Sequence, residues 1–361
     1  MTYDWGLLKL TSRYINIGRV SELARSAIRI IAPILLALVV GGLILVILGK
    51  DPIAYYWYVV KRGLLSWTGF QATLVRTAPL LFVAAGLIVA FRAGIWNLGV
   101  DGQFLLAAVL VAAVGSPLNT IIPNWAMICI CFILAATIGA IWSLIPAYLK
   151  ANHGVNEIIT TLMMTFIGIS LANVLIKIPF NDPATTVPQT VTLAVEDRLP
   201  RLFDTIIHHG VILGLLSVLF VHFLMTRTSF GLNLQVVGAN PKAAVHAGLN
   251  VRFLTYVAFG LSAALAGMGG AVEILGVWGT VRADWDPAYG LLVVPLVFLA
   301  RFHGIGTIAF VLFFAVLMIG GESASRRLGV PTFFVLVLVG LLLMFLAIVE
   351  YLDHRWRQRT T

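Results

Sequence analysis

Long apolar runs of about 20 residues recur along the whole chain and are separated by short polar connectors. As a helix, each run is long enough to cross a hydrocarbon layer of roughly 30 Å. The runs do not alternate apolar and polar positions, as the strands of a membrane barrel do. The pattern predicts an all-α, polytopic membrane protein with about ten spans, at residues 30–48, 71–91, 103–115, 124–148, 156–176, 210–226, 253–275, 290–301, 304–320 and 332–350.

The composition supports this fold class, because 60% of the residues are hydrophobic and only 11% are charged. Soluble domains carry about 25% charged residues. Cys129 and Cys131 lie two positions apart inside a span, so on a helix they point in different directions, and we expect neither a disulfide nor a metal site. The net charge of +9 is better explained by topology than by nucleic-acid binding, since cytoplasmic connectors of membrane proteins collect Lys and Arg.

The basic residues predict that both ends of the chain are cytoplasmic. An even number of spans puts the two ends on one side, and both the segment 1–29 and the tail 351–361 are basic. The transmembrane domain then covers residues 30–350, with an outer loop at 178–208 and a cytoplasmic loop at 227–252. The N-terminal segment is either a helix lying on the inner leaflet or a basic lead-in to the first span.

The two halves of the chain are weakly similar to each other. A span that contains Pro79 is followed by Arg92 and a Gly-rich segment, and a span that contains Pro295 is followed by Arg301 and a second Gly-rich segment. Transporters are often built from such repeats, with broken helices near the solute path. We therefore expect broken or re-entrant elements in both halves.

A polar island at residues 235–250 carries its own helix start and stop signals. Asn240 is a good N-cap, Pro241 suits the first helical position, and Gly248 is placed to end the helix. About two turns rich in alanine lie between these signals. The island predicts a short, capped helix that the protein presents to a partner.

Polar residues inside the spans are candidates for a solute pathway, because such groups are costly in lipid. The stretch from Asn97 to Gln103 interrupts two apolar spans, and Gly99 weakens the helix there. This stretch is either a re-entrant element beside the pathway or a tight cytoplasmic turn that follows Arg92.

Further pathway candidates lie in two other spans. Glu273, near the outer end of its span, is either a pathway residue or a carboxylate that faces the pathway mouth or pairs with another helix. Glu157 starts a span from the inside, where the helix dipole stabilises an acid, and it either stays there as a cap or takes part in gating. Asn173 lies deeper and can hydrogen-bond a polar solute or a neighbouring helix. Thr160 and Thr161, which follow Glu157, complete this set.

The chain shows little sign of enzyme chemistry. It has no zinc-type His/Glu motif, no Gly-x-Ser-x-Gly and no Gly-x-x-x-x-Gly-Lys-Ser/Thr phosphate loop. We therefore expect no catalytic activity and no cofactor held by this chain. If ATP drives transport, another subunit must bind the nucleotide.

Four stretches together resemble the permease subunits of bacterial ABC importers, within the branched-chain amino acid, ribose and nucleoside permease family. These stretches are residues 92–103, 154–164, 238–244 and 287–295 with the span that follows. Their order and spacing are similar to the family domain over about residues 30–350. The form of the first two looks most like the nucleoside and simple-sugar subgroup.

The resemblance implies a multi-pass protein of the bacterial cytoplasmic (inner) membrane. It also implies three kinds of partner: an ABC ATPase subunit that uses ATP, a second permease subunit that is a paralogue in this subgroup, and an extracytoplasmic solute-binding protein. The polar island is then the coupling helix that contacts the ATPase, and the residues that match it are Gly238, Ala239, Asn240, Pro241, Lys242, Ala243, Ala244 and Gly248. The chain departs from the family pattern at Ala300-Arg301-Phe302-His303, where a Gly-Arg pair followed by Asn or Ser is more usual.

The leading hypothesis is therefore an ABC importer permease for a nucleoside or a related simple-sugar-like solute. Other members of the family carry ribose-type sugars or branched-chain amino acids, so these solutes stay open as alternatives. A secondary transporter would need ion-coupling carboxylates at mid-membrane, of which the sequence offers few. A membrane enzyme would need a catalytic cluster, which the sequence does not offer.

Overall fold

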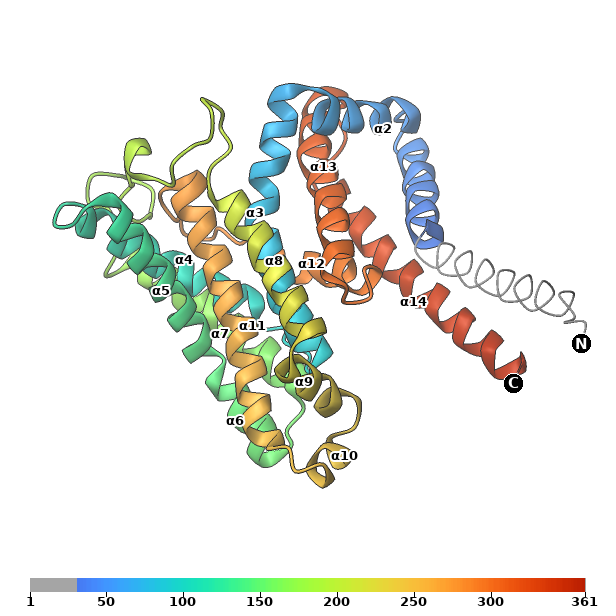
Figure 1. The fold of residues 1–361 in the computed structure, drawn as a ribbon. Coiled ribbons are helices and arrows are strands. Elements are labelled where there is room, and N and C mark those ends of the chain that lie inside the picture. The colour runs from blue at the N-terminus through green and yellow to red at the C-terminus, as the bar shows by residue number, and fades with distance from the viewer. Residues whose placement is uncertain (1–30, 361) are drawn as a thin grey trace, which may run out of the picture. The chain divides into compact units, whose positions relative to one another are not determined.

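The computed structural model describes residues 31–360, so the predictions for residues 1–29 lie outside the described part of the chain. Nearly all of the described chain is helical (Figure 1), and its β-type pairing is limited to two isolated bridges, Gln189–Arg282 and Arg201–His208. The predicted all-α membrane fold is confirmed. The predicted tail at 351–361 continues the last helix as far as residue 360.

Each predicted span coincides with an apolar helix. Eight described helices are long and apolar enough to cross a membrane, and two more, including the first, are shorter. In chain order the elements are Ile31–Ile47, α2 (Pro52–Val60), η1 (Lys61–Leu65), α3 (Trp67–Arg92), α4 (Val100–Asn119), α5 (Asn124–Trp142), α6 (Leu144–His153), α7 (Glu157–Lys177), η2 (Val195–Asp197), α8 (Gly210–Arg227), α9 (Ser229–Ala239), α10 (Pro241–His246), α11 (Val251–Glu273), η3 (Ile274–Trp278), α12 (Tyr289–Leu299), α13 (Gly304–Leu328) and α14 (Phe334–Thr360).

The chain divides into two compact units. The small unit comprises the described residues up to Tyr56 together with those from Ser325 onward, and the large unit comprises Trp57–Ala324. The predicted domain at 30–350 therefore includes parts of both units. Each unit has its own packing.

The small unit is held by aromatic and polar contacts near helix ends. The ring of Tyr55 meets that of Phe334 edge-on, with centroids 5.3 Å apart, and the hydroxyl of Tyr56 donates to the carbonyl of Leu38 at 2.8 Å. The ammonium group of Lys50 donates to the carbonyl of Leu328, the last residue of α13, at 2.9 Å. A cation at that position offsets the negative end of the helix dipole.

In the large unit, α11 packs against α3, α4 and α5. This close packing depends on glycine: a Cβ atom at Gly139 of α5 would run into the carbonyl of Ala263, and one at Gly267 of α11 would run into the carbonyl of Ala135. Small residues let helix backbones approach in this way within membranes. A Cβ atom at Gly270, three residues before Glu273, would likewise run into the carbonyl of Phe104 in α4.

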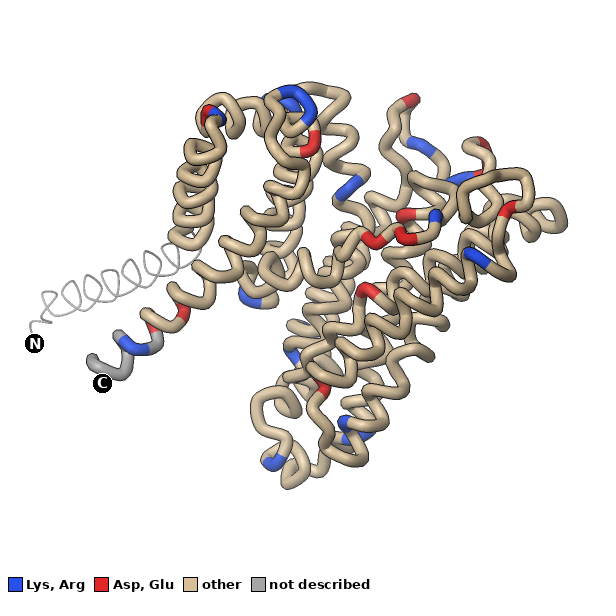
Figure 2. The backbone as a smooth tube through the Cα atoms, turned by 180° about the vertical axis from the view of Figure 1, so that it is seen from behind, with Lys and Arg blue, Asp and Glu red and all other residues tan. Residues whose placement is uncertain are grey.

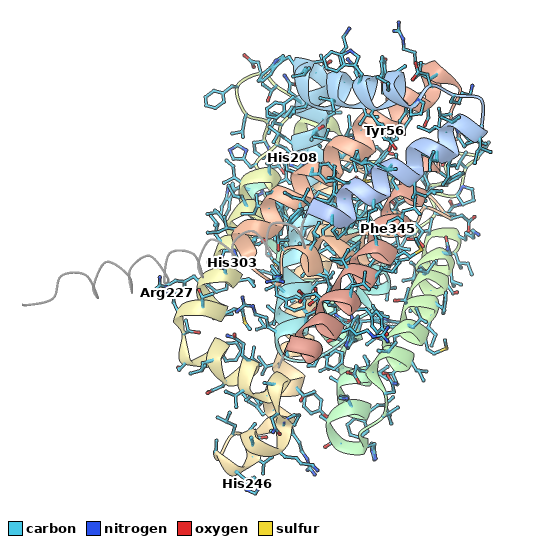
Figure 3. All side chains as sticks on the ribbon, turned by 90° about the vertical axis from the view of Figure 1, so that its right-hand side faces the viewer. Tyr56, His208, Arg227, His246, His303 and Phe345 are labelled. Atoms are coloured by element: carbon cyan, nitrogen blue, oxygen red, sulfur yellow. The ribbon has the colours of Figure 1, made fainter. Side chains whose placement is uncertain are left out.

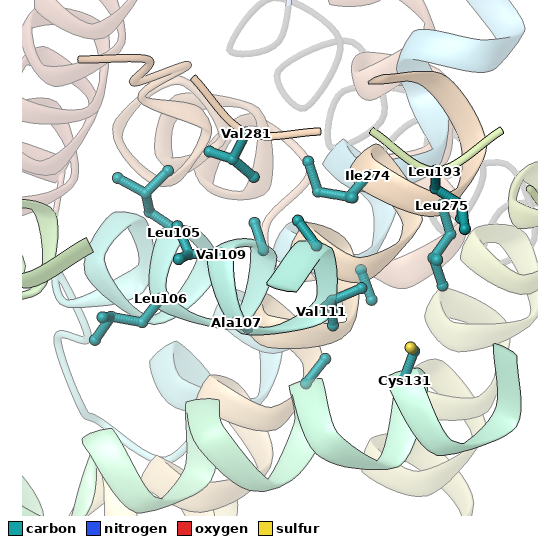
Figure 4. Packing of buried hydrophobic residues seen from close by; sticks show 14 of the residues in the cluster. Leu105, Leu106, Ala107, Val109, Val111, Cys131, Leu193, Ile274, Leu275 and Val281 are labelled. Carbon is teal, nitrogen blue, oxygen red and sulfur yellow. The ribbon is translucent and has the colours of Figure 1, made fainter. Parts of the chain in front are cut away.

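The apolar core of the large unit lies where α4, α5 and the end of α11 meet (Figure 4). Leu105 and Val109 of α4 lie in one cluster with Ile274 and Leu275 of η3. Leu193, from the predicted outer loop, is also part of the cluster and is 4% exposed. The loop is thus anchored in the core.

Backbone and side-chain hydrogen bonds hold the outer loop against the segment that begins with η3. The amide of Leu199 donates to the carbonyl of Leu275 at 2.8 Å, and the guanidinium of Arg198 donates to the carbonyl of Val277 at 2.7 Å. His208, labelled in Figure 3, is buried at the end of this loop. Burial, with smaller contributions from nearby positive groups, lowers the pKa of His208 to about 4.

The broken elements of the two halves meet inside the large unit. α3 ends at Arg92 and α12 is only 11 residues long. The guanidinium Nε of Arg92 donates to the carbonyl of Phe302 at 3.1 Å, and the ring of Trp96 stacks on that of Phe298 with centroids 5.3 Å apart. In the turn after α12, Arg301 and Phe302 adopt left-handed conformations with φ of 51° and 58°. Non-glycine residues rarely adopt this conformation, so the departure from the family pattern coincides with an unusual turn.

Candidate functional site

The polar island folds as the short helix α10. The side chain of Asn240 accepts a hydrogen bond from the amide of Ala243 at 3.1 Å, and Pro241 occupies the first turn. Gly248, with φ of +80°, lies two residues after the helix ends at His246. The predicted start and stop signals therefore act as the sequence indicated.

α10 lies at the tip of one end of the large unit, which we call the α10 end (Figures 1 and 3). The side chains of Pro241, Lys242 and Ala243 are exposed, and Val245 is 61% exposed. Ala244 differs from its predicted contact role, because its side chain is fully buried against the rest of the island. Of the two adjacent alanines, only Ala243 offers its side chain to a partner.

The α10 end is strongly basic. Lys242 of α10, Lys150 of α6 and Arg252 of α11 lie in connectors or helix termini of this end, and Glu157 is the only acid in residues 143–157 and 227–252. Its carboxylate is 2.7 Å from the ammonium group of Lys150. Figure 2 shows Lys and Arg at this end, while most acidic positions of the large unit lie nearer its other end.

α9, which leads into α10, lies directly against the break between α3 and α4. A Cβ atom at Gly94, which has φ of +70°, would lie 2.8 Å from the Cα of Gly238, and one at Gly238 would lie 2.6 Å from the carbonyl oxygen of Arg92. The guanidinium of Arg92 also donates to the side chain of Gln235 in α9 at 3.2 Å. The end of α3 and α9 are therefore in direct contact, and α10 follows α9 in the chain.

The stretch from Asn97 to Gln103 is buried inside the protein. The amide group of Asn97 donates to Gln103 at 3.1 Å and to Ser262 of α11 at 3.0 Å, and all three side chains are 1% exposed or less. The hydroxyl of Thr161 is bonded to the backbone of the same stretch. The structure thus brings four candidates, Gly99 included, together around the short irregular segment between α3 and α4, which is surrounded by protein.

The side chains of the other candidates bond elsewhere, and Glu157 meets this cluster only through its backbone carbonyl, which accepts from Thr161 at 2.6 Å. Glu157 pairs with Lys150 at the start of α7, and the neighbouring Thr160 bonds only to backbone carbonyls of its own helix. Asn173 accepts a hydrogen bond from the amide of Asp284 at 2.7 Å and donates to its own helix. In this conformation their polar groups bond to the protein itself.

Glu273 pairs with another helix, which was one of the three interpretations that the sequence left open. Its carboxylate lies 3.5 Å from the guanidinium of Arg76 in α3 and accepts hydrogen bonds from Trp278 at 2.9 Å and Tyr289 at 3.2 Å. The hydroxyl of Tyr289 also accepts from Arg76. The cluster connects α3, α11, η3 and α12, and Glu273 itself is only 1% exposed.

Asp101 has a role that the sequence did not reveal. Its carboxylate accepts hydrogen bonds from the amides of Gly290 at 2.5 Å and Leu291 at 3.4 Å, and so caps the start of α12 from α4. Unpaired amides at a helix start favour a carboxylate. The sequence signal was an acid between two apolar spans, but its partner is far away along the chain.

Comparison with known proteins gives the family. The family model described as the permease component of branched-chain amino acid transport systems matches residues 69–347. A glucose ABC transporter permease protein of Haloferax volcanii is 34% identical over 88% of this chain and 86% of its own length. A guanosine ABC transporter permease protein of Bacillus subtilis is 27% identical over 91% of this chain and 94% of its own, and a nucleoside ABC transporter permease protein of Lactococcus lactis is 26% identical over 87% and 89%.

The family match covers most of the large unit and extends into the small one. The expected resemblance is therefore confirmed over most of the chain. The chain belongs to the family of membrane permease components of branched-chain amino acid-type ABC transport systems.

Proposed function

We propose that this chain is the permease subunit of an ABC importer for a nucleoside or a simple sugar. The relatives named for glucose, guanosine and nucleosides support this solute class over a branched-chain amino acid. The chain holds no cofactor of its own, and ATP is used by a separate ATPase subunit. It works beside a second, paralogous permease and receives solute from an extracytoplasmic binding protein.

The observation that carries the proposal is the exposed α10. α10 is a short helix that is capped at both ends and packs through the buried Ala244. It projects from the large unit, with the small side chain of Ala243 on its exposed side. In α9, which precedes α10, Gly238 and Gln235 contact Arg92 and Gly94 at the end of α3. An ATPase seated on α10 therefore has a route of direct contacts to the re-entrant stretch.

The charge distribution supports a cytoplasmic location for the α10 end. The connectors of this end are rich in Lys and Arg, and positive charge gathers on the cytoplasmic side of membrane proteins. The basic residues of the segments 1–29 and 351–361 support a cytoplasmic location for both termini as well, with the protein in the cytoplasmic membrane. The loop at 178–208 then faces the binding protein.

A bulky residue at the exposed alanine tests the docking role. We expect Ala243→Trp to leave the fold intact, because the side chain points away from the protein, and to weaken ATPase association at least tenfold, because a close contact cannot accommodate it. The matched control is Ala184→Trp, at an exposed alanine of the outer loop. Co-purification that survives Ala243→Trp as well as it survives Ala184→Trp would reject α10 as the docking helix.

A further inference from the structure

A cavity of about 250 Å³ lies directly beside α10. Its walls come from Ile95 after the α3 break, Val237 of α9, Pro241 of α10 and Val251 of α11, and its two basic side chains are Lys150 and Arg252. A water molecule occupies roughly 30 Å³ of liquid, so the cavity has room for a side chain of another protein.

The two cations of the cavity differ in whether an acidic group of this chain already pairs with them. Lys150 is already neutralised by Glu157, whose carboxylate is 2.7 Å away. Arg252 is exposed, and among the described residues its guanidinium has neither an ion pair nor a hydrogen bond. Guanidinium groups prefer carboxylate and phosphate partners because their N–H donors match two oxygens at once.

The backbone around Arg252 adds to the positive potential. Arg252 lies in the first turn of α11, a helix of 23 residues, and Asn250 caps only the amide of Phe253 there. The positive end of the helix dipole thus points toward the same region. The cavity combines apolar side chains with Thr255 and two basic side chains, and suits a short side chain that ends in a negative group.

We propose that this cavity receives an aspartate or glutamate side chain of the ATPase subunit, which pairs with Arg252. The proposal rests on the proposed function, because Pro241 belongs both to α10 and to the cavity wall. A protein seated on the exposed face of α10 covers the cavity mouth with its own surface. The ATPase cleft that receives α10 therefore carries an acidic residue at its edge.

Charge variants of Arg252 provide the test, with ATPase affinity measured in nanodiscs of zwitterionic lipid. We expect Arg252→Lys to bind within about threefold of the unchanged protein, Arg252→Gln about tenfold more weakly and Arg252→Glu more than a hundredfold more weakly. The matched control is Arg227→Glu at the end of α8, which does not line the cavity and lies back from His246 in Figure 3. It should change affinity less than threefold. Raising the salt concentration should weaken binding of the unchanged protein more than that of Arg252→Gln.

Replacing the ATPase acids near the docking cleft with lysine, one at a time, should identify one variant that restores binding to Arg252→Glu. Equal affinity for Arg252→Glu and Arg227→Glu would overturn the proposal. So would an effect of Arg252→Gln that appears only when anionic lipid is added, since the cavity would then hold a lipid phosphate. If Ala243→Trp abolishes binding while Arg252→Glu does not, α10 docking stands and the cavity role falls; if neither does, the proposed function falls.

Discussion

The most buried acid of the large unit, Glu273, shows what a single residue contributes at membrane depth. It accepts hydrogen bonds from two side chains and pairs with Arg76, whose side chain is 20% exposed. An unpaired charge in such a place is costly, so the pair is needed once either member is present. The Arg76–Glu273 pair therefore links α3 to α11 and stabilises their packing.

We expect Glu273→Gln to lower the free energy of unfolding by about 3 kcal/mol, because it leaves the guanidinium of Arg76 without its counter-charge. Thermal unfolding in detergent measures this. The control is Asp284→Asn, which breaks the exposed pair with Lys177 and should cost under about 1 kcal/mol. Equal losses for the two variants would show that Glu273 is not a buried structural partner.

The sequence indicated which residues matter at this scale but not which residues meet. Glu273, Asn97 and Gln103 were singled out because polar groups are costly in lipid, and all three are buried. Their partners, such as Arg76 and Ser262, come from distant helices. Hydrophobic periodicity assigns a residue to a span, but it does not determine which faces of two spans touch.

At the scale of elements, capping chemistry predicted α10 in detail, because caps act within a few residues of one another. The approach of α9 to the α3 break was not predictable, since it depends on two glycines far apart in the sequence. Gly94 and Gly238 both stood in the stretches that resemble the family. Only the structure shows that they touch.

This approach leaves no room for a methyl group. We expect Gly94→Ala to cost about 3 kcal/mol, because it combines a left-handed backbone with a Cβ atom 2.8 Å from the Cα of Gly238. Gly154 provides the control: it has a similar φ of +66° but nothing within 4 Å of a Cβ atom, so Gly154→Ala should cost only about 1 kcal/mol. Thermal unfolding of the two variants compares them directly. Equal losses in the free energy of unfolding for the two variants would show that the close approach of α9 adds nothing to the effect of Gly94→Ala.

At the scale of the whole molecule, the spans followed from hydrophobic runs alone. Every predicted span coincides with a helix, and the short eighth span is the 11-residue α12. Its shortness was visible because the apolar run is short. The sequence did not reveal that Asp101 caps α12 or that the turn after α12 contacts Arg92. Both contacts join residues from different halves of the chain, which local sequence patterns do not pair.

This chain and the ATPase subunit have different roles in the transporter. The sequence contains no phosphate loop, and we propose that the exposed, basic α10 end is the surface on which a subunit that has one docks. A transporter of this kind moves solute only when the ATPase is present and bound. An ion-coupled transporter would not need that subunit.

Uptake into proteoliposomes that contain this chain, its partner permease and the ATPase, with the solute-binding protein added outside, tests this claim most directly. We expect ATP-dependent uptake of a nucleoside or simple sugar and its loss in Ala243→Trp. Uptake that proceeds without the ATPase on an ion gradient, or that is limited to branched-chain amino acids, would contradict it.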